Sequence, residues 1–227
     1  MNNLEDLKLR EVRLRAPLTE DDIRSLEIGD VVFLDGVLFT GREGLYSQLF
    51  DLNLQPPVDI RSLSNVTFHC SPAVNELRPG EYHIPAVSAT ASFRFDKYIP
   101  LLFERYDVRV IIGKGGMQKE IYQSTFRKYG AVYLTTVGYG LGALYGRGIR
   151  SVKDVHWKEE LGLAQAMWVL EVENLGPFLV ECNAQGRSLF EMANAEINQR
   201  FEKLYAGLPQ PKLKRLGEVT SPTCEVL

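Results

Sequence analysis

Residues 86–96 read AVSATASFRFD, a run of small and hydroxylated residues that ends in Arg94 and Asp96. Residues 108–116 read VRVIIGKGG, an apolar strand-like segment followed by Lys114 among glycines. Hydroxyl groups, backbone N–H groups and a fixed positive charge at the start of a helix are suited to binding an anion. The two cations at turn positions therefore indicate a carboxylate or phosphate ligand.

The segments on either side of this stretch alternate between strand-like and helix-like patterns. Short apolar runs rich in β-branched and aromatic residues predict strands, and apolar residues spaced three and four apart predict helices. This alternation is typical of an α/β layer with a partly parallel sheet. We expect strands near 7–14, 31–40, 65–70, 82–87, 108–112, 131–134, 152–157, 167–172 and 178–182, and helices near 19–26, 45–52, 98–106, 118–129 and 188–204.

Three local signals predict where elements begin and end. Thr19 and Asp22 have the spacing of a capping box at the start of a helix. The pair Asp35-Gly36 divides the apolar run 31–40 and predicts a hairpin turn there. The pair Ser71-Pro72 predicts the end of the strand that begins at Asn65.

Composition is typical of a globular protein and sets limits on its partners. The chain has 227 residues, of which 45% are hydrophobic and 24% charged, and its net charge is −3. No run approaches the length of a membrane span, and the first residues lack the pattern of a secretory signal, so we expect a cytoplasmic protein. The charge gives no general attraction to nucleic acid or to an anionic membrane.

No linker or internal repeat divides the sequence, and we expect one domain over residues 1–207. Residues 208–227 contain prolines and lysines without periodicity, and we expect a flexible tail there.

The cysteines and histidines do not predict a metal site on this chain. The cysteines are odd in number, widely spaced and without a C-x-x-C pair, and the histidines have no second ligand at helical or strand spacing. An iron–sulfur cluster on this chain would require the fold to gather all three cysteines, which we consider the minority alternative because free cysteines are usually small buried hydrophobes. The residues in question are Cys70, Cys182, Cys224, His69, His83 and His156.

Four polar residues follow strand-like segments, where open α/β sheets gather their ligands: Arg42, Thr90, Arg94 and Lys114. The alternative for any one of the cations is a solvated surface charge, since most charged residues are exposed, and Thr90 alone is equally compatible with a helix cap. The pairing of Arg94 and Lys114 with small neighbours that let a ligand approach makes the two interpretations about equally favoured.

The order of five motifs resembles a known family. The similarity covers about residues 7–205 and is to the C-terminal domain of class I fumarases, which also occurs as the separate β subunit of two-chain fumarases and L(+)-tartrate dehydratases. The motifs are Gly29-Asp30, Thr40-Gly41-Arg42-Glu43, His69-Cys70-Ser71-Pro72, the segment 90–96 and Ile112-Gly113-Lys114-Gly115.

The resemblance implies a swivelling β/β/α domain with a mixed sheet and a hydro-lyase that adds or removes water across a small carboxylate. It also implies a [4Fe–4S] cluster that acts as a Lewis acid and is held by three cysteines of a cluster-bearing α subunit, with none bound by this chain. Arg42, Arg94 and Lys114 match the family's carboxylate-binding positions. Thr90 matches a threonine implicated in acid–base or positioning work beside the substrate.

The sequence departs from the family's pattern at three places. Tyr46 stands where the family commonly has His, Phe93 replaces the Gly before the motif's Arg, and Ser71 replaces the Gly of a Cys-Gly-Pro motif. A tyrosine does not titrate near neutral pH as histidine does. The changes favour a different or bulkier substrate, or reduced activity.

The leading hypothesis is the β subunit of a heteromeric iron–sulfur-dependent hydratase or dehydratase. The alternative is a non-catalytic carboxylate-binding or assembly subunit that has lost the chemistry, and a self-contained enzyme without a cluster is a third, less favoured one. An adjacent gene for a chain with three suitably placed cysteines would distinguish them.

Overall fold

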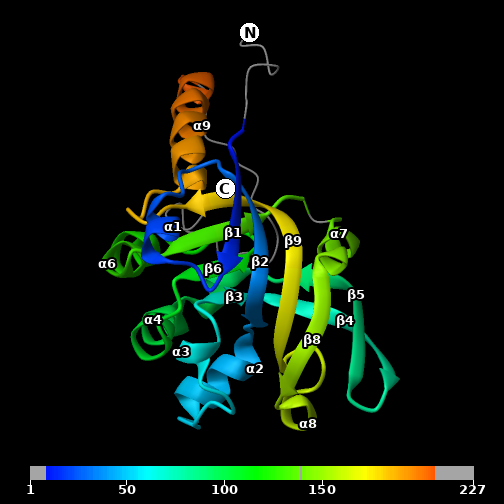
Figure 1. The fold of residues 1–227 in the computed structure, drawn as a ribbon. Coiled ribbons are helices and arrows are strands. Elements are labelled where there is room, and N and C mark those ends of the chain that lie inside the picture. Colours follow the sequence, from blue (N-terminus) through cyan, green and yellow to red (C-terminus); the bar gives the residue numbers. More distant parts are fainter. Residues whose placement is uncertain (1–8, 139, 208–227) are drawn as a thin grey trace, which may run out of the picture. The chain divides into compact units, whose positions relative to one another are not determined.

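The computed structural model describes residues 9–138 and 140–207, and contacts between residues divide the chain into two units, Met1–Met192 and Ala193–Leu227 (Figure 1). The first unit contains all of the strands in the described residues. The predicted tail, 208–227, lies outside the described residues.

A seven-stranded mixed sheet forms the centre of the first unit, which confirms the α/β prediction. Strands β1, β2, β3, β6 and β7 run parallel to one another, and β9 pairs antiparallel with β7, β8 and also β2. Strands β2, β3, β6, β7 and β9 therefore form a closed ring of pairings. In spatial order the strands are β1 (Glu11–Ala16), β2 (Val31–Thr40), β3 (Val66–Phe68), β6 (Val110–Gly113), β7 (Val132–Thr136), β9 (Met167–Cys182) and β8 (Ile149–His156).

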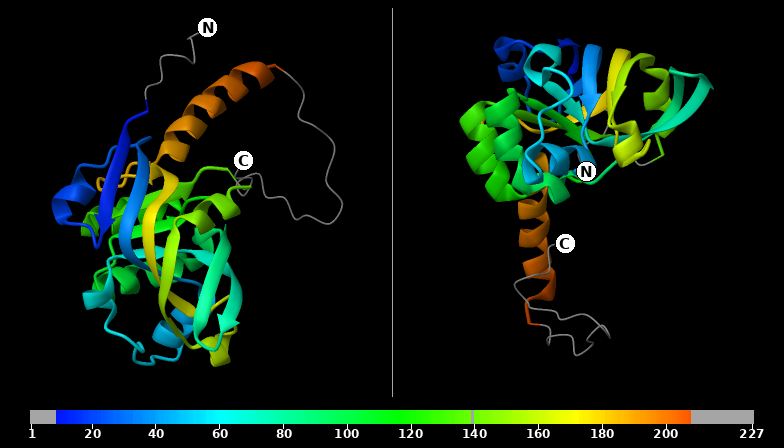
Figure 2. Two further views of the ribbon diagram at one scale, coloured as in Figure 1. Left: turned by 45° about the vertical axis from the view of Figure 1, so that its right-hand side comes forward. Right: turned by 90° about the horizontal axis from the view of Figure 1, so that it is seen from below.

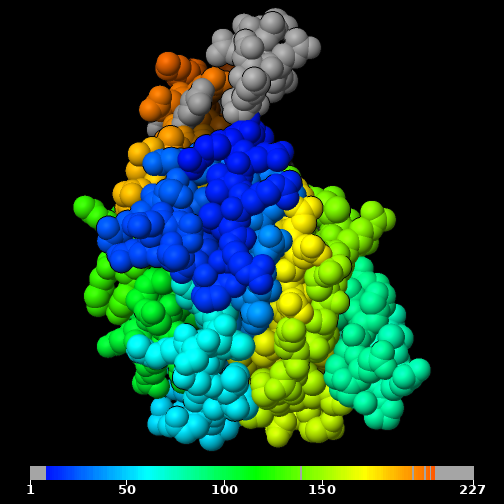
Figure 3. All heavy atoms as spheres, in the orientation of Figure 1, coloured from blue at the N-terminus to red at the C-terminus, as the bar shows by residue number. Residues whose placement is uncertain are grey.

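The sheet has apolar residues on both faces because successive side chains of a strand point to opposite sides. In β6, Val110 and Ile112 belong to one buried cluster and Ile111 to the other. Both clusters are built from fully buried aromatic and aliphatic side chains, with Trp168 in the first and Phe103 in the second. Figure 3 shows β1, in blue, on the surface, as expected of an edge strand.

Short helical segments connect the strands. The predicted helix 118–129 is present as three consecutive segments, α5, η4 and α6, and the capping box of Thr19 and Asp22 opens α1 as predicted. The segments are α1 (Glu20–Arg24), α2 (Glu43–Tyr46), η2 (Ser47–Asp51), α3 (Ile60–Leu63), η3 (Ser92–Tyr98), α4 (Ile99–Tyr106), α5 (Lys119–Ile121), η4 (Tyr122–Phe126), α6 (Arg127–Tyr129), α7 (Gly142–Arg147) and α8 (Lys158–Leu161).

A separate two-stranded hairpin, β4 (Cys70–Arg78) and β5 (Glu81–Ala89), turns at Gly80. Figure 2 shows this hairpin and the helices α4 to α6 on opposite sides of the sheet. The prediction that a strand ends at Ser71-Pro72 is wrong, because β4 runs through Pro72, which pairs with Val87. Each strand of a two-stranded sheet has a free edge, so a residue without an N–H group is tolerated there.

The hairpin turn predicted at Asp35-Gly36 is also wrong. Strand β2 continues through both residues, and its pairing with β9 changes register between Leu34 and Gly36. Gly36 has φ +100°, and a Cβ atom there would lie 2.1 Å from the carbonyl oxygen of Ala16 in β1. The glycine therefore serves a bulge and a close strand contact, which share with hairpin turns the need for a positive φ.

The segments 167–172 and 178–182, predicted as two strands, are parts of one strand, β9. Its first part pairs with β8, its last part pairs with β7, and its pairing with β2 overlaps both. The predicted helix 188–204 is present as α9 (Leu189–Tyr205). It begins after Ser188, whose hydroxyl accepts a hydrogen bond from the backbone N–H of Glu191. Among the described residues, no helix is long and apolar enough to cross a membrane.

Candidate functional site

The four predicted site residues all follow strands. Arg42 precedes α2 directly after β2, Thr90 follows β5, Arg94 lies in η3, and Lys114 follows β6. Strands β2 and β6 both run parallel to β3, which lies between them, so their carboxyl ends share one edge of the sheet. The topology therefore brings Arg42 and Lys114 to the same edge.

Backbone hydrogen bonds join the segments 86–96 and 108–116. Thr90 donates its N–H to the carbonyl of His69 (2.8 Å) and accepts from the N–H of Lys114 (3.3 Å). Lys114 in turn accepts from the N–H of Ser92 (3.2 Å), and Ala91 forms a parallel bridge with Lys114. The turn that carries Thr90 and the loop that carries Lys114 are thus one hydrogen-bonded unit.

Arg42 is partly buried and incompletely paired. Its Nη1 donates to the carbonyl of Ala164 (3.0 Å) and to the hydroxyl of Ser71, and its buried Nε has no hydrogen-bond partner among the described residues. Burial lowers the pKa of the Arg42 guanidinium, and the positive charge of Arg94 lowers it further. Two neighbouring arginines with an unused buried donor form a good receptor for an anion.

Arg94 and Thr90 are in direct contact. The Nη2 of Arg94 donates to the hydroxyl of Thr90, and its guanidinium lies 5.5 Å from the ring centroid of Phe95. The Thr90 side chain is almost fully buried. Because its oxygen accepts from Arg94, the hydroxyl proton of Thr90 is oriented away from the guanidinium and is available to another acceptor.

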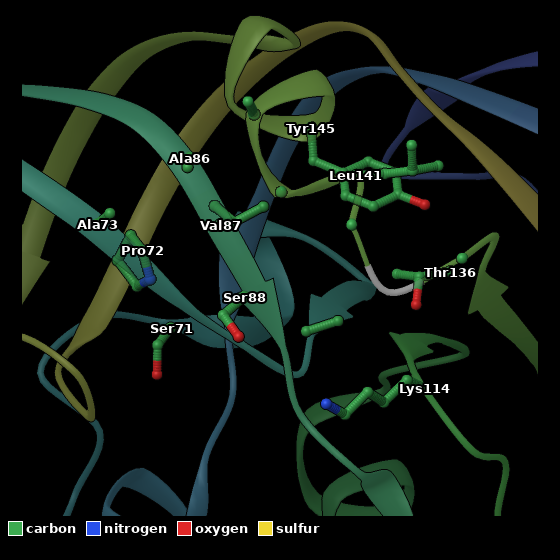
Figure 4. A pocket seen from close by; sticks show the side chains of 15 residues that line it. Ser71, Pro72, Ala73, Ala86, Val87, Ser88, Lys114, Thr136, Leu141 and Tyr145 are labelled. Atoms are coloured by element: carbon green, nitrogen blue, oxygen red, sulfur yellow. The ribbon is translucent and has the colours of Figure 1, made fainter.

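A cavity of about 480 Å³ adjoins Lys114 (Figure 4). Ser71 and Ser88, from the two hairpin strands, line it on one side, and Thr136, at the end of β7, lines it on the other. Figure 4 shows the Lys114 side chain directed toward the hairpin. The remaining walls come from apolar residues of the hairpin, from the described part of the glycine-rich segment 138–143 and from Tyr145.

Neither Ser88 nor Thr136 is among the residues predicted for the site, and Ser71 was predicted only as a strand end and noted as a departure from a motif. Ser88 lies within the segment 86–96. Thr136 ends strand β7, in which the preceding residue, Thr135, pairs with Gly113, next to Lys114. The hydroxyl-bearing residues at the ends of strands were therefore the sequence signal that could have identified these two site residues. Arg42, Thr90, Arg94 and Lys114 are all brought to this edge, although only Lys114 among them lines the cavity itself.

Cys70 and Cys182 are fully buried, each in a different apolar cluster, and burial raises the pKa of both thiols. In the described residues no group of three or more His, Cys, Asp or Glu side chains is arranged to hold a metal ion. Cys224 lies outside the described residues. The residues described here do not fit an iron–sulfur cluster.

A mixed α/β domain with three cations and several hydroxyl groups at the ends of its strands has the chemistry that suits an anion. The chain belongs to the fumarase C-terminus family, whose model matches residues 1–193.

Similar proteins include separate subunits and a longer single chain. The chain is 30% identical over 190 residues to the "Putative L(+)-tartrate dehydratase subunit beta" of Methanocaldococcus jannaschii, covering 82% of this chain and 95% of that protein. It is 27% identical over 176 residues to the L(+)-tartrate dehydratase subunit beta of Escherichia coli, and the match covers 78% of this chain and 85% of that protein. It is 33% identical over 186 residues to the "Putative fumarate hydratase class I" of Geobacillus stearothermophilus, and the match covers 82% of this chain and 35% of that protein.

Proposed function

We propose that this chain is the β subunit of an iron–sulfur-dependent hydratase or dehydratase that acts on a small hydroxylated carboxylate. In this proposal the chain supplies the carboxylate-binding half of a shared active site. The observation that carries it is the partly buried Arg42, which has an unused Nε donor and Arg94 as a close like charge. Such an arrangement is stabilised when an anion binds between the cations.

The three cations suit the chemistry of a hydro-lyase. Arg42 and Arg94 are able to hold one carboxylate through paired N–H donors, and Lys114 adds a positive charge at the cavity. Negative charge on the carboxylate grows as a proton leaves the adjacent carbon, so fixed cations stabilise the transition state more than the bound substrate. Thr90 would assist the proton transfer or orient the substrate through its hydroxyl.

The names of two relatives support a separate partner subunit. The chain covers most of two proteins named as β subunits but only 35% of a single-chain relative. We therefore propose that an α subunit corresponds to the rest of such a chain and holds the [4Fe–4S] cluster, which supplies Lewis-acid chemistry when bound. We further propose that residues 1–207 form a swivelling β/β/α domain and that the hetero-oligomer is cytoplasmic.

Exposed apolar side chains next to the site support docking of this α subunit. Phe93 precedes Arg94, Leu163 precedes Ala164, Val137 follows Thr136, and Leu144 lies between two residues that line the cavity. We call Phe93, Val137, Leu144 and Leu163 the apolar rim. Exposed apolar residues gathered around a polar site are typical of an interface that closes over it.

The environment of Tyr46 is relevant to the alternative hypothesis that the subunit is non-catalytic. The side chain is fully buried and does not line the cavity, and burial raises the pKa of its hydroxyl. Its presence in place of histidine therefore removes no titrating group from the cavity described here. The alternative stays an outcome of the test below.

The test is hydro-lyase activity of the full chain co-expressed with a cluster-bearing partner. We expect turnover of a hydroxylated dicarboxylate such as L-tartrate or malate, and a loss of about 10²-fold or more in kcat/KM for Arg94→Ala and Lys114→Ala. Arg61→Ala is the control, because Arg61 also donates to backbone carbonyls but lies away from the site. Carboxylate binding without turnover would favour the non-catalytic alternative, and full activity in both variants would refute the assignment of the cations.

A further inference from the structure

Four fully buried polar side chains form a hydrogen-bonded chain beneath the site. The hydroxyl of Tyr46 lies 2.8 Å from Nε2 of His69, and Nδ1 of His69 lies 2.7 Å from the hydroxyl of Ser92. The hydroxyl of Tyr133 donates to the same Ser92 oxygen at 2.8 Å. We call these residues the buried network. They come from four parts of the chain: α2, the link between β3 and β4, η3 and β7.

The network is electrically neutral. Burial lowers the pKa of His69 to about 3, so its ring is uncharged at neutral pH and pairs through one donor and one acceptor nitrogen. Burial also raises the pKa of the Tyr46 and Tyr133 hydroxyls. The network therefore adds no fourth positive charge beneath the cations, and it contributes no group that titrates near neutral pH.

Two glycines show how closely the network approaches the backbone next to Arg42 and Lys114. Gly41 precedes Arg42, and a Cβ atom on it would lie 2.2 Å from the hydroxyl of Tyr46. Gly113 precedes Lys114, and a Cβ atom on it would lie 2.0 Å from the hydroxyl of Ser92. The space that a side chain would occupy before each cation is thus filled by a hydroxyl group of the network.

The network also reaches the turn that carries Thr90 and Arg94. His69 accepts the backbone N–H of Thr90 (2.8 Å), and Ser92 donates its own N–H to the carbonyl of Lys114 (3.2 Å). His69 N–H is in turn bonded to the carbonyl of Ile112 (2.7 Å). All the segments that present the site residues are therefore attached to one buried cluster.

We propose that the buried network positions Arg42, Arg94 and Lys114 relative to one another, and that Tyr46, His69 and Ser92 are positioning residues of the site. The inference rests on the proposed function for its catalytic consequence. Like charges repel, and Arg42 already has a pKa lowered by its neighbour Arg94. A fully paired buried network specifies a single arrangement, which keeps the cations in place before the anion arrives.

The test combines a structural readout with kinetics. The full chain carrying Ser92→Ala, or the milder Tyr46→Phe, is compared with the parent by NMR of the arginine Nε–H groups. Tyr98→Phe is the matched control, because its ring packs 5.7 Å from that of Tyr46 while its hydroxyl is bonded outside the network, to Asp51. We expect the Arg42 or Arg94 signal to shift or broaden in both network variants and to stay unchanged in the control.

In the assembled complex, the network variants are expected to raise KM for the carboxylate by about tenfold, with a smaller change in kcat, since misplaced cations weaken charge-assisted hydrogen bonds. Unchanged arginine signals and KM in folded Tyr46→Phe and Ser92→Ala would overturn the inference. So would protonation of the His69 ring above pH 5. If the arginine signals change but the parent complex has no activity, the positioning role holds and the proposed function fails.

Discussion

The hydroxyl of Ser71 lies against the guanidinium of Arg42, accepting a hydrogen bond from Nη1 while it donates to the carbonyl of Ala164 at 3.1 Å. The family resemblance drawn from the sequence implies glycine at this position. Ser71 therefore occupies a donor of Arg42 that a substrate carboxylate would otherwise use, and it narrows the cavity that it lines.

Replacing Ser71 by glycine is expected to lower KM for a small dicarboxylate by up to about tenfold, since one charge-assisted donor becomes available. Steady-state kinetics of the complex measure the effect. Ser88→Gly is the control, because Ser88 is the residue paired with Ser71 across the hairpin. A rise in KM for Ser71→Gly alone would mean instead that the hydroxyl orients Arg42.

Thr90 is expected to act on the chemical step. Its hydroxyl is oriented by Arg94, so Thr90→Val, which keeps the side-chain shape, should lower kcat by about 10²-fold with little change in KM. Thr90→Ser should restore most of the activity. A loss confined to KM in Thr90→Val would assign the residue to binding alone.

The apolar rim is expected to govern association with the α subunit. Phe93→Ser and Leu163→Ser should each weaken the complex by about tenfold or more, as truncation of a buried interface anchor does. Calorimetric titration of the two subunits measures it. Leu77→Ser is the control, since Leu77 is exposed on the hairpin but does not belong to the rim. An equal loss in the control, or no loss in the rim variants, would place the interface elsewhere.

Asp96 predicts a pH-dependent stability. Burial raises the pKa of its carboxyl from 3.8 to about 6. The folded state thus binds a proton that the unfolded state releases, so this stabilising contribution is complete below pH 3.8 and is lost as the pH rises through 6. The Asp96→Asn variant has no titrating group at this position. The free energy of unfolding of the variant minus that of the parent should therefore increase from pH 4 to pH 7.

Denaturant unfolding at several pH values measures this effect. Asp59→Asn is the control, for which the opposite pH dependence of stability is expected, because hydrogen bonds with Ser62 and Arg61 lower the pKa of Asp59. Its contribution is present above the unfolded pKa and is lost as the pH falls through the folded value. A pH-independent difference between Asp96→Asn and the parent would show that Asp96 is not desolvated.

The sequence predicted the parts of the site that follow from strand order. Thr90 and Lys114 come after strand-like segments, and the sheet edge then determines that they meet. The error at Asp35-Gly36 arose because a bulge and a hairpin turn require the same backbone conformation. The local pattern carries no information on which strand will approach the glycine, and here that strand is β1.

The buried network was not predictable in this way. Tyr46, His69 and Ser92 are separated by 23 residues at each step, and no spacing rule relates them. In the sequence, His69 is notable only as part of the motif His69-Cys70-Ser71-Pro72 and as a histidine without a second metal ligand at helical or strand spacing. Its partners are hydroxyl groups contributed by other elements, and they are brought to it by tertiary packing alone.

The most direct test of the central claim is a crystal structure of the assembled complex with a bound dicarboxylate inhibitor. We expect a carboxylate oxygen about 2.7–2.9 Å from Nε of Arg42, in contact also with Arg94, with the remainder of the ligand in the cavity beside Lys114. A ligand bound in the active site of the complex without contact to Arg42, Arg94 or Lys114 would contradict it.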